Sequence, residues 1–205
     1  MFTKNFVELS KNDVKIASWV GELETYLNVT ENNLLYFIQK CWSSLFTPRA
    51  IFYRFENKLH KQKVSVAVVI QKMVQSEISG ICFTVHPVTK DKNQMVIEAG
   101  FGLGEFIVGG LITPDTYVVH KNNFSIADIS ISFQTAKLIK TAKGNLKKKL
   151  TKAQGNKQKL PEEQIVILAK ICAHIEKHYR HPQDIEWAYE KGKFYITQAR
   201  PITTL

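Results

Sequence analysis

The residues whose types and spacing could do chemistry lie at positions 184–201. Two runs of alternating polar and apolar residues flank a Lys-Gly pair, and this pattern predicts a β-hairpin. Side chains alternate between the faces of a strand, so Gln198 and Arg200 point the same way. Asp184 and Glu186 share a face of the partner strand for the same reason. If the register places Glu186 opposite Gln198, a carboxylate, an amide oxygen and a guanidinium converge on one wet face.

Such a trio can hold a divalent cation and a polyphosphate. Hard cations prefer oxygen ligands, and the guanidinium group of arginine offers a planar fork to phosphate oxygens. The alternative is an ordinary amphipathic hairpin that carries a surface ion pair. Spacing alone leaves both interpretations open.

A second candidate lies at the end of the apolar run 64–74. The run turns polar at Gln71 and Lys72, and such a strand end often marks the edge of a cleft. There the backbone could bond to the edge of an adenine while Met73 and Val74 pack against its ring. The signal is weak by itself, because every strand end must become polar somewhere.

A third candidate lies at 19–28, where one glycine, two acids and a threonine occur close together. Gly21 could bring backbone N–H groups near a phosphate, and Thr25 could offer its hydroxyl group. The alternative is a loop that leads into a helix. The glycines at 100–104 match neither the dinucleotide-binding spacing nor a Walker loop, and they are also compatible with a tight turn from strand to helix.

The elements that must position these residues are of both types, so the pattern predicts an α+β fold. A helix should follow Thr30, and Thr47-Pro48 should end it and start another. The run 64–74 is apolar on both faces, which predicts a central strand buried inside a sheet. Further strands are expected at 78–85, 95–99 and 117–119, and Pro161 should open an amphipathic helix.

Composition excludes several classes of protein. With 44% hydrophobic residues the chain can bury a core. We find neither an apolar run of the roughly 20 residues that a membrane span needs nor a signal-peptide pattern, so we expect a cytoplasmic protein without a membrane partner. Three widely separated cysteines, an odd number, indicate reduced and mostly buried thiols.

The net charge of +10 comes mostly from one segment, 121–159, which holds ten lysines and a single acid, Asp128. The segment has no arginine and few aromatic residues on which bases could stack, which argues against a nucleic-acid partner. We expect a solvated, lysine-rich excursion that interrupts the sheet.

Four collinear segments closely resemble the nucleotide-binding domain of phosphoenolpyruvate synthases, the pyruvate, water dikinases. Each is a short motif, and together they extend over nearly the whole chain. They are Gly21 to Val29; Val66 to Val74 with Ser79 to Thr89; Gly102 to Glu105 with Thr113 to Val119; and Pro182 to Ala188 with Gln198 to Thr203.

The resemblance implies a single ATP-grasp domain over 1–205 that binds ATP and Mg²⁺. Residues 1–62 would be the helical part of an incomplete first lobe. Residues 63–205 would form a mostly complete second lobe, with a mixed or antiparallel sheet and flanking helices. The implied contacts are Gln71, Met73 and Val74 for adenine, Gly21 and Thr25 over the phosphates, Glu186 and Gln198 for Mg²⁺ and phosphate, and Arg200 as the catalytic charge-neutralising residue.

In that family ATP phosphorylates a histidine on a carrier domain, and pyruvate then receives the phosphoryl group. The products are phosphoenolpyruvate, AMP and phosphate. This chain lacks the family's N-terminal lysine and arginine and its phosphohistidine and pyruvate-binding domains, so we expect these domains in trans or missing, and the isolated chain to be incompletely active. Two alternatives stay open: the ATP domain of a rifampicin-type antibiotic phosphotransferase, and an inactive remnant or basic binding module.

Overall fold

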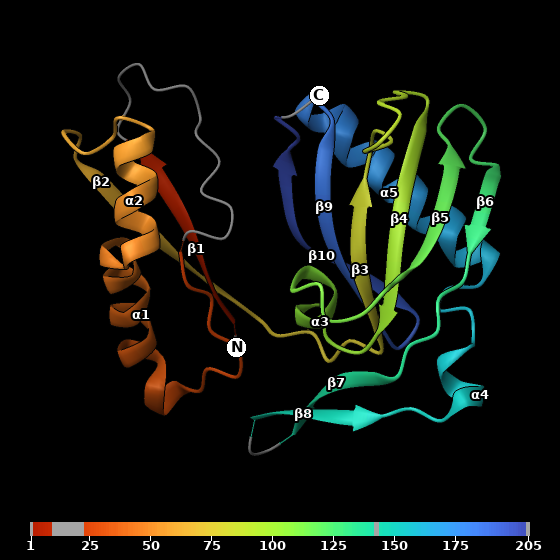
Figure 1. Cartoon of the computed structure of the whole chain (residues 1–205), viewed down its shortest axis with the longest axis horizontal. Helices are drawn as coiled ribbons and strands as arrows, with labels where there is room; N and C mark the ends of the chain where they lie inside the picture. Colours follow the sequence, from red (N-terminus) through yellow and green to blue (C-terminus); the bar gives the residue numbers. More distant parts are fainter. Residues whose placement is uncertain (1, 10–22, 142–143, 204–205) are drawn as a thin grey trace. The chain divides into compact units, whose positions relative to one another are not determined.

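The computed structural model describes residues 2–9, 23–141 and 144–203. The chain folds into two compact units, Met1–Met73 and Val74–Leu205 (Figure 1). The boundary follows strand β2, so this strand belongs to the first unit.

The first unit combines a two-stranded antiparallel sheet with short helices. Strands β1 (Phe2–Leu9) and β2 (Val64–Gln71) pair along their whole length. The chain between them forms η1 (Glu31–Asn33), α1 (Leu34–Ser43), η2 (Ser44–Phe46) and α2 (Pro48–Glu56). The hydroxyl oxygen of Thr47 accepts a hydrogen bond from the backbone N–H of Ala50 at 3.3 Å and so caps α2. Both helices predicted after Thr30 and Thr47 are confirmed.

Two predictions for this unit need correction. Among the described residues β2 pairs only with β1, so it is not a central strand, and Ala67 and Ile70 along it are exposed. A continuous apolar run therefore misled the prediction, because it does not distinguish a strand inside a large sheet from one in a small sheet. Strand β1 also lies in a stretch for which only helices were expected.

The second unit is built on a six-stranded sheet whose neighbours are all antiparallel, in the order β10-β9-β3-β4-β5-β6. The strands are β3 (Ile78–Phe83), β4 (Gln94–Phe101), β5 (Asp115–His120), β6 (Ile126–Ser130), β9 (Gln183–Glu190) and β10 (Lys193–Pro201). The predicted strands in 78–119 are confirmed, and the α+β class is correct.

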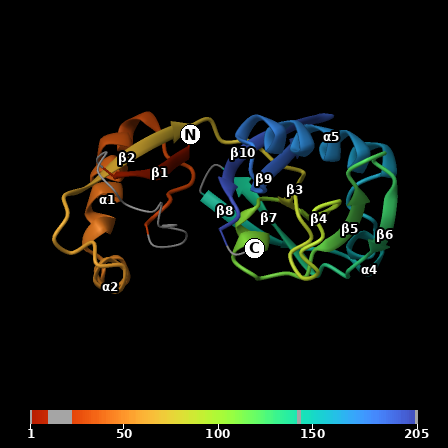
Figure 2. The same cartoon turned by 90° about the horizontal axis from the view of Figure 1, so that it is seen from above.

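Helix α5 (Glu162–Tyr179) covers one face of this sheet (Figures 1 and 2). Pro161 occupies the N-cap and acids fill the first turn, as the sequence predicts. The helix buries an apolar stripe of Ile165, Leu168, Ala169 and Cys172. This stripe packs into one core with Ile97, Tyr117, Ile185 and Trp187 of the sheet. Helix α5 thus packs against only one of the two faces of the sheet.

The lysine-rich segment holds more structure than the sequence predicts. It contributes the edge strand β6, a ribbon of β7 (Ala136–Thr141) and β8 (Gly144–Lys149), and the short helix α4 (Lys152–Gly155). It is also not solvated throughout. Lys159 is buried against Asp115, and Lys121 binds Glu176 at 2.7 Å. No helix in the described part of the chain is long and apolar enough to cross a lipid bilayer.

Candidate functional site

The terminal hairpin has the register on which the proposed chemistry depends. A tight turn joins β9 to β10, and both of its central residues have positive φ, 49° at Lys191 and 81° at Gly192, as the tight turns of hairpins require. Glu186 lies directly opposite Gln198, and Asp184 lies opposite Arg200. The condition that the sequence analysis placed on this hairpin is therefore met.

A β-bulge at Thr197 shifts the side-chain alternation of β10, so that equivalent side chains before and after it point to opposite faces of the sheet. Ile196 pairs with Trp187 and packs on the core side, whereas Gln198, two residues later, pairs with Glu186 on the other side. In a strand without a bulge, strict alternation would put the side chains of Ile196 and Gln198 on the same face. The sequence holds a sign of this change, because apolar residues at 194 and 196 give way to polar residues at 198 and 200.

The face opposite α5 carries the polar side chains of the hairpin together with one from the middle of the sheet. Ile81 of β3 pairs with Glu186 on one side and with Glu98 of β4 on the other. Glu98, Glu186 and Gln198 therefore lie in one row across the sheet. Asp184 and Arg200 lie in the adjacent row, two residues along the strands. We call this set of five side chains the polar face.

Arg200 is held by a carboxylate of its neighbouring strand. Its Nε and Nη2 groups both donate to Oδ2 of Asp184, at 2.8 and 2.7 Å. The side chains are 28% and 14% exposed, so the pair is largely withdrawn from water. The contact fixes the direction of the guanidinium. It leaves three of the five arginine N–H groups for other acceptors.

Two carboxylates on the polar face are only partly compensated for their burial. Burial raises the pKa of Glu98 above its usual value, and the nearby charge of Asp184 raises it further. The Oδ1 atom of Asp184 is buried without a hydrogen-bond partner among the described residues. Both observations indicate a surface that a cation would stabilise.

Glu98 is the residue of this face that sequence reasoning missed. It interrupts an otherwise apolar and buried strand, Met95-Val-Ile-Glu-Ala99. A lone acid in such a strand was the available signal, since ionisable residues are rarely buried without a partner.

A glycine turn borders the polar face at the end of β4. The hydroxyl group of Ser79 donates to the carbonyl oxygen of Gly102 at 2.7 Å, and the Ser79 side chain also lies beside Gly104. Ser79 is on the same face of β3 as Ile81, one pleat period along the strand. Ser79, which holds this turn, therefore lies about 7 Å from the row of Glu98 and Glu186, by the strand rise.

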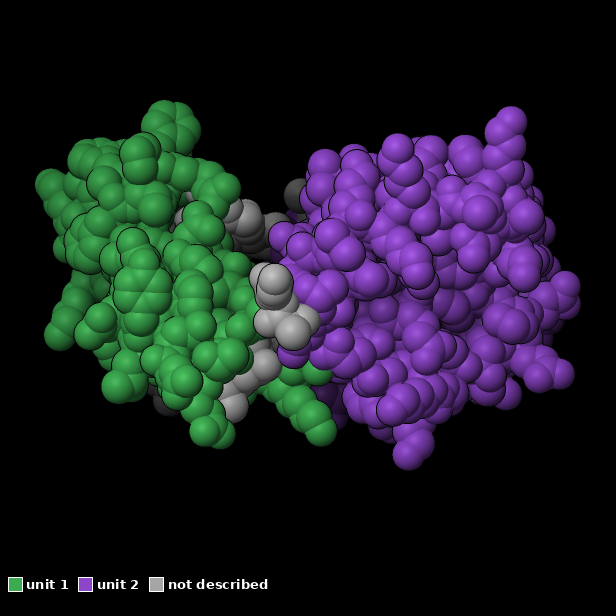
Figure 3. All heavy atoms as spheres, turned by 90° about the horizontal axis from the view of Figure 1, so that it is seen from below, with its two compact units in different colours: residues 1–73 green, residues 74–205 purple. Residues whose placement is uncertain are grey.

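The other predicted site residues are divided between the units (Figure 3). Thr25 is exposed, Gln71 is half-buried and Met73 is buried, all in the first unit, and Val74 opens the second. Gly21 lies outside the described residues. The polar face thus brings together Glu186, Gln198 and Arg200, whereas the suggested adenine and phosphate contacts stay predictions.

No three acidic, histidine or cysteine side chains of the described residues are arranged to hold a metal ion by themselves. A cation on the polar face would need further oxygen ligands, such as an amide, a phosphate or water. Gln198 opposite Glu186 can supply the amide oxygen.

Residues 10–205 match the family model described as "Pyruvate phosphate dikinase, AMP/ATP-binding domain". The chain belongs to this family. It is 48% identical over 195 residues to a probable phosphoenolpyruvate synthase of Methanocaldococcus jannaschii, covering 94% of the chain and 16% of the relative. It is 44% identical to the phosphoenolpyruvate synthase of Pyrococcus furiosus and 43% identical to the rifampicin phosphotransferase of Bacillus cereus, and it covers 25% and 22% of them.

The family assignment agrees with the resemblance that the four collinear segments indicate. The chain spans a quarter or less of the length of these three relatives, so most of each relative has no counterpart in this sequence.

Proposed function

We propose that this chain is the ATP-binding portion of a dikinase of the phosphoenolpyruvate synthase type. The observation that carries the proposal is the polar face, where Glu186 lies opposite Gln198 and Arg200 is held on the same side of the sheet. The family match supports a nucleotide as the ligand. Phosphoryl transfer depends mainly on positioned charge and needs few acid–base groups, which fits a site rich in fixed charges.

In this proposal the chain forms one ATP-grasp domain over residues 1–205, with 1–62 as part of the first lobe and 63–205 as the second. Gln71, Met73 and Val74 contact the adenine. Gly21 and Thr25 belong to the loop over the phosphates. The antiparallel sheet of the second unit supports the second lobe, because one of its faces packs against α5 and the other carries the polar face.

Arg200 acts on the phosphate oxygens. Asp184 accepts from one edge of the guanidinium, so its remaining N–H groups are oriented before the nucleotide binds. These donors neutralise the negative charge that phosphoryl transfer spreads over the phosphate oxygens. Asp184 thereby orients the arginine.

The residues of the polar face fit a magnesium ion. Glu186 and Gln198 would hold it through oxygen atoms, and the buried Oδ1 of Asp184, which has no hydrogen-bond partner among the described residues, lies on the same face. When bound, Mg²⁺ would neutralise part of the charge on the phosphate oxygens. Glu98 contributes negative potential to the same face.

As the resemblance of the four sequence segments implies, the phosphoryl group would pass to a carrier histidine and then to pyruvate. The carrier and pyruvate sites would be supplied by domains outside this sequence. A rifampicin phosphotransferase is the second candidate, because the Bacillus cereus enzyme is similar at nearly the same identity as the Pyrococcus enzyme. Both functions use the same nucleotide site and differ in the acceptor.

Isothermal titration calorimetry of the full chain with Mg-ATP tests the proposal. Wild type should bind, and Glu186→Ala should weaken binding at least tenfold, because a charged contact to a bound ligand is worth about 1.5–3 kcal/mol. Lys193→Ala is the control, since Lys193 is exposed on the same hairpin and pairs with Glu190, four residues beyond Glu186 along β9. It should bind like wild type.

Equal heats for wild type and Glu186→Ala would refute the site assignment. Titrating ATP with Ca²⁺ or with EDTA in place of Mg²⁺ distinguishes the contribution of the metal to binding from that of the nucleotide. If Mg-ATP and metal-free ATP bind wild type equally well, the magnesium part of the proposal is wrong.

A further inference from the structure

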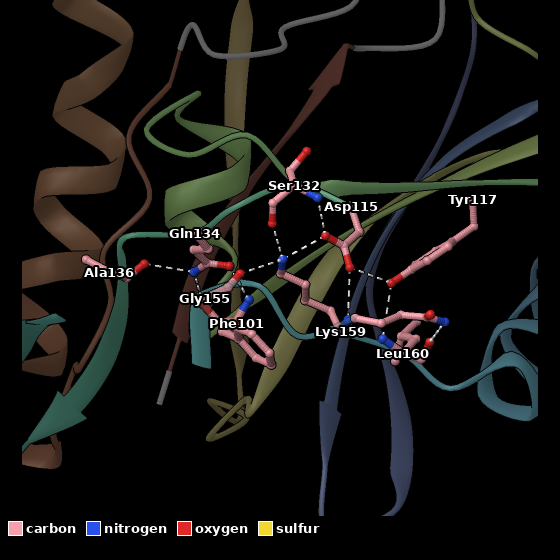
Figure 4. Close-up of polar contacts among 10 residues, drawn as sticks. Phe101, Asp115, Tyr117, Ser132, Gln134, Ala136, Gly155, Lys159 and Leu160 are labelled. Carbon is pink, nitrogen blue, oxygen red and sulfur yellow. Dashed lines mark hydrogen bonds and ion pairs between the residues drawn. The ribbon is translucent and has the colours of Figure 1, made fainter. Parts of the chain in front are cut away.

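Gln134 grips the end of strand β4 with its side-chain amide (Figure 4). Its Oε1 accepts from the backbone N–H of Phe101 at 2.8 Å, and its Nε2 donates to the carbonyl oxygen of Phe101 at 2.9 Å. Nε2 also donates to the carbonyl oxygen of Ala136 at 2.8 Å. Only 1% of Gln134 is exposed. This one side chain therefore pairs with Phe101 as a neighbouring strand would and ties it to β7.

A buried ion pair holds the segment that carries Gln134. The Nζ atom of Lys159 donates to Oδ1 of Asp115 at 2.7 Å and to the carbonyl oxygen of Ser132 at 2.5 Å (Figure 4). Oδ1 of Asp115 also accepts from the backbone N–H of Ser132 at 2.9 Å. Both charged side chains are completely buried. Ser132, two residues before Gln134, is thus fixed at its N–H and at its carbonyl group.

A close backbone approach adds a second restraint on Gln134. Its backbone N–H donates to the carbonyl oxygen of Gly155 at 3.1 Å. A Cβ atom at Gly155 would meet the backbone oxygen of Gln134 and the ring of Phe133. Only glycine permits this contact.

The grip on Phe101 sets the geometry of the glycine turn that follows it. Gly102 has φ of 94°, and its backbone N–H donates to the carbonyl oxygen of Glu77 at 2.8 Å. The N–H of Leu103 donates to the carbonyl oxygen of Leu138 at 2.9 Å, and Ser79 holds the carbonyl oxygen of Gly102. The turn is thus bonded on one side to β7 and on the other to the strand that passes through the polar face.

We propose that Gln134 is a positioning residue for the nucleotide site. The Lys159–Asp115 pair anchors the segment that carries Gln134. The Gln134 amide fixes Phe101, the last residue of β4, so that the turn at 102–104 forms one border of the polar face. The inference rests on the proposed function and deepens it. It gives a role to the lysine-rich segment, which the sequence motifs left without one.

The physical reason is the demand for precision at a phosphate site. Displacing a binding group by about 1 Å can cost a factor of the order of 100 in rate, so a border made of flexible glycines needs external support. An amide side chain that satisfies three backbone groups supplies this support. Replacing it leaves those groups unpaired in the interior.

Tyr117 provides a matched control within the same network. Its hydroxyl group donates to Oδ2 of Asp115 at 2.9 Å and accepts from the backbone N–H of Leu160 at 3.2 Å. Tyr117 is as buried as Gln134, but it binds Oδ2 of Asp115, whereas the contacts that hold Ser132 use Oδ1. Tyr117→Phe should therefore lower the stability of the second unit and leave the Kd for Mg-ATP within about twofold of wild type, because lost stability alone does not move a site that stays folded.

The test variant is Gln134→Glu, which keeps the size of the side chain. An ionised glutamate sets negative oxygens against the carbonyl groups of Phe101 and Ala136, whereas a protonated one can donate again to one of them. Burial raises the pKa of such a carboxyl group, so acidification should restore the contact within an accessible pH range.

Calorimetry with Mg-ATP should be run at pH 8 and pH 6 on wild type, Gln134→Glu and Tyr117→Phe. The expected ratio of the Gln134→Glu Kd to the wild-type Kd is about ten at pH 8, with recovery toward one at pH 6. Comparing variants at each pH removes the protonation of ATP itself from the comparison. A ratio near one at pH 8 would overturn the positioning role.

A measurement on wild type covers the case in which Gln134→Glu does not fold. In hydrogen exchange, the amides of Phe101, Gly102 and Leu103 should exchange as slowly as those in the middle of β4. Each donates a hydrogen bond: to Oε1 of Gln134, to the carbonyl oxygen of Glu77 and to that of Leu138, respectively. Exchange orders of magnitude faster than in β4 would contradict it. Wild type that fails to bind Mg-ATP would refute the proposed function and its positioning residue together, whereas unchanged binding by a folded Gln134→Glu would refute the positioning role alone.

Discussion

Replacing Arg200 by glutamine removes the cation that Asp184 holds on the polar face. Asp184 would lose both of its charge-assisted hydrogen bonds at Oδ2, and its Oδ1 already has no hydrogen-bond partner among the described residues. Breaking a buried pair costs about 3–5 kcal/mol, and hydrogen bonds to charged groups are worth about 1.5–3 kcal/mol. Because Arg200 is 28% exposed, water screens part of this loss. We expect a destabilisation of about 2–3 kcal/mol, by this reasoning.

A double-mutant cycle separates the pair from its surroundings. Asp184→Asn should also destabilise, because it leaves the arginine without its counter-charge. In the Asp184→Asn and Arg200→Gln double variant two neutral amides can face each other. The two effects should then be non-additive by about 1–2 kcal/mol.

Urea unfolding followed by tryptophan fluorescence measures these changes. Trp187 lies in the core of the second unit, so substituting phenylalanine for the tryptophans at 19 and 42 gives a signal from that unit alone. With an m-value of about 1–3 kcal/mol per molar urea, the midpoint should fall by roughly 1 M for Arg200→Gln. A loss under about 0.5 kcal/mol, or effects that add within that margin, would refute the reasoning.

Three further predictions follow from features of the second unit. Glu98→Gln should stabilise the protein at neutral pH. Because folding raises the pKa of Glu98, the folded state binds the proton more tightly, so wild type should lose stability as pH rises through the interval between the ordinary and the raised pKa, and the variant should lose this part of the pH dependence in urea titrations. Gly102→Ala should cost more than about 1 kcal/mol and lower the melting temperature, because its φ is positive and a Cβ atom would meet the carbonyl oxygen of Leu138, whereas Gly192→Ala in the open hairpin turn should cost less; equal losses would contradict this. Burial raises the pKa of the Cys82 thiol, so a disulfide reagent should leave it unmodified in native protein at pH 8, and rapid labelling there would show that the core opens.

The sequence predicted the hairpin and its neighbours well, because local signals determine them. Alternation on both sides of a Lys-Gly turn sets the register, and the periodic stripe after Pro161 sets α5. These signals need only near neighbours along the chain.

The sequence did not reveal what depends on distant partners. Glu98 joins the polar face because β3 lies between β4 and β9, an order that no local pattern specifies. Lys159 looked like one more solvated lysine, since its partner Asp115 lies far away along the chain. The composition of the strand at 64–71 resembles that of a buried strand and so predicts a place inside a sheet, whereas burial depends on the number of neighbouring strands.

The β-bulge at Thr197 gives the two halves of β10 different surroundings. Phe194 and Ile196 pack against the core, while Gln198 and Arg200 belong to the polar face, although all four residues have even numbers in the sequence. We therefore expect substitutions of Phe194 and Ile196 to lower stability alone, and substitutions of Gln198 and Arg200 to change the polar face as well. Residues 198 and 200 can therefore change during evolution while the core contacts of Phe194 and Ile196 are kept. Deleting Thr197, or inserting a second residue beside it, would move the side chains of one half of β10 to the wrong face.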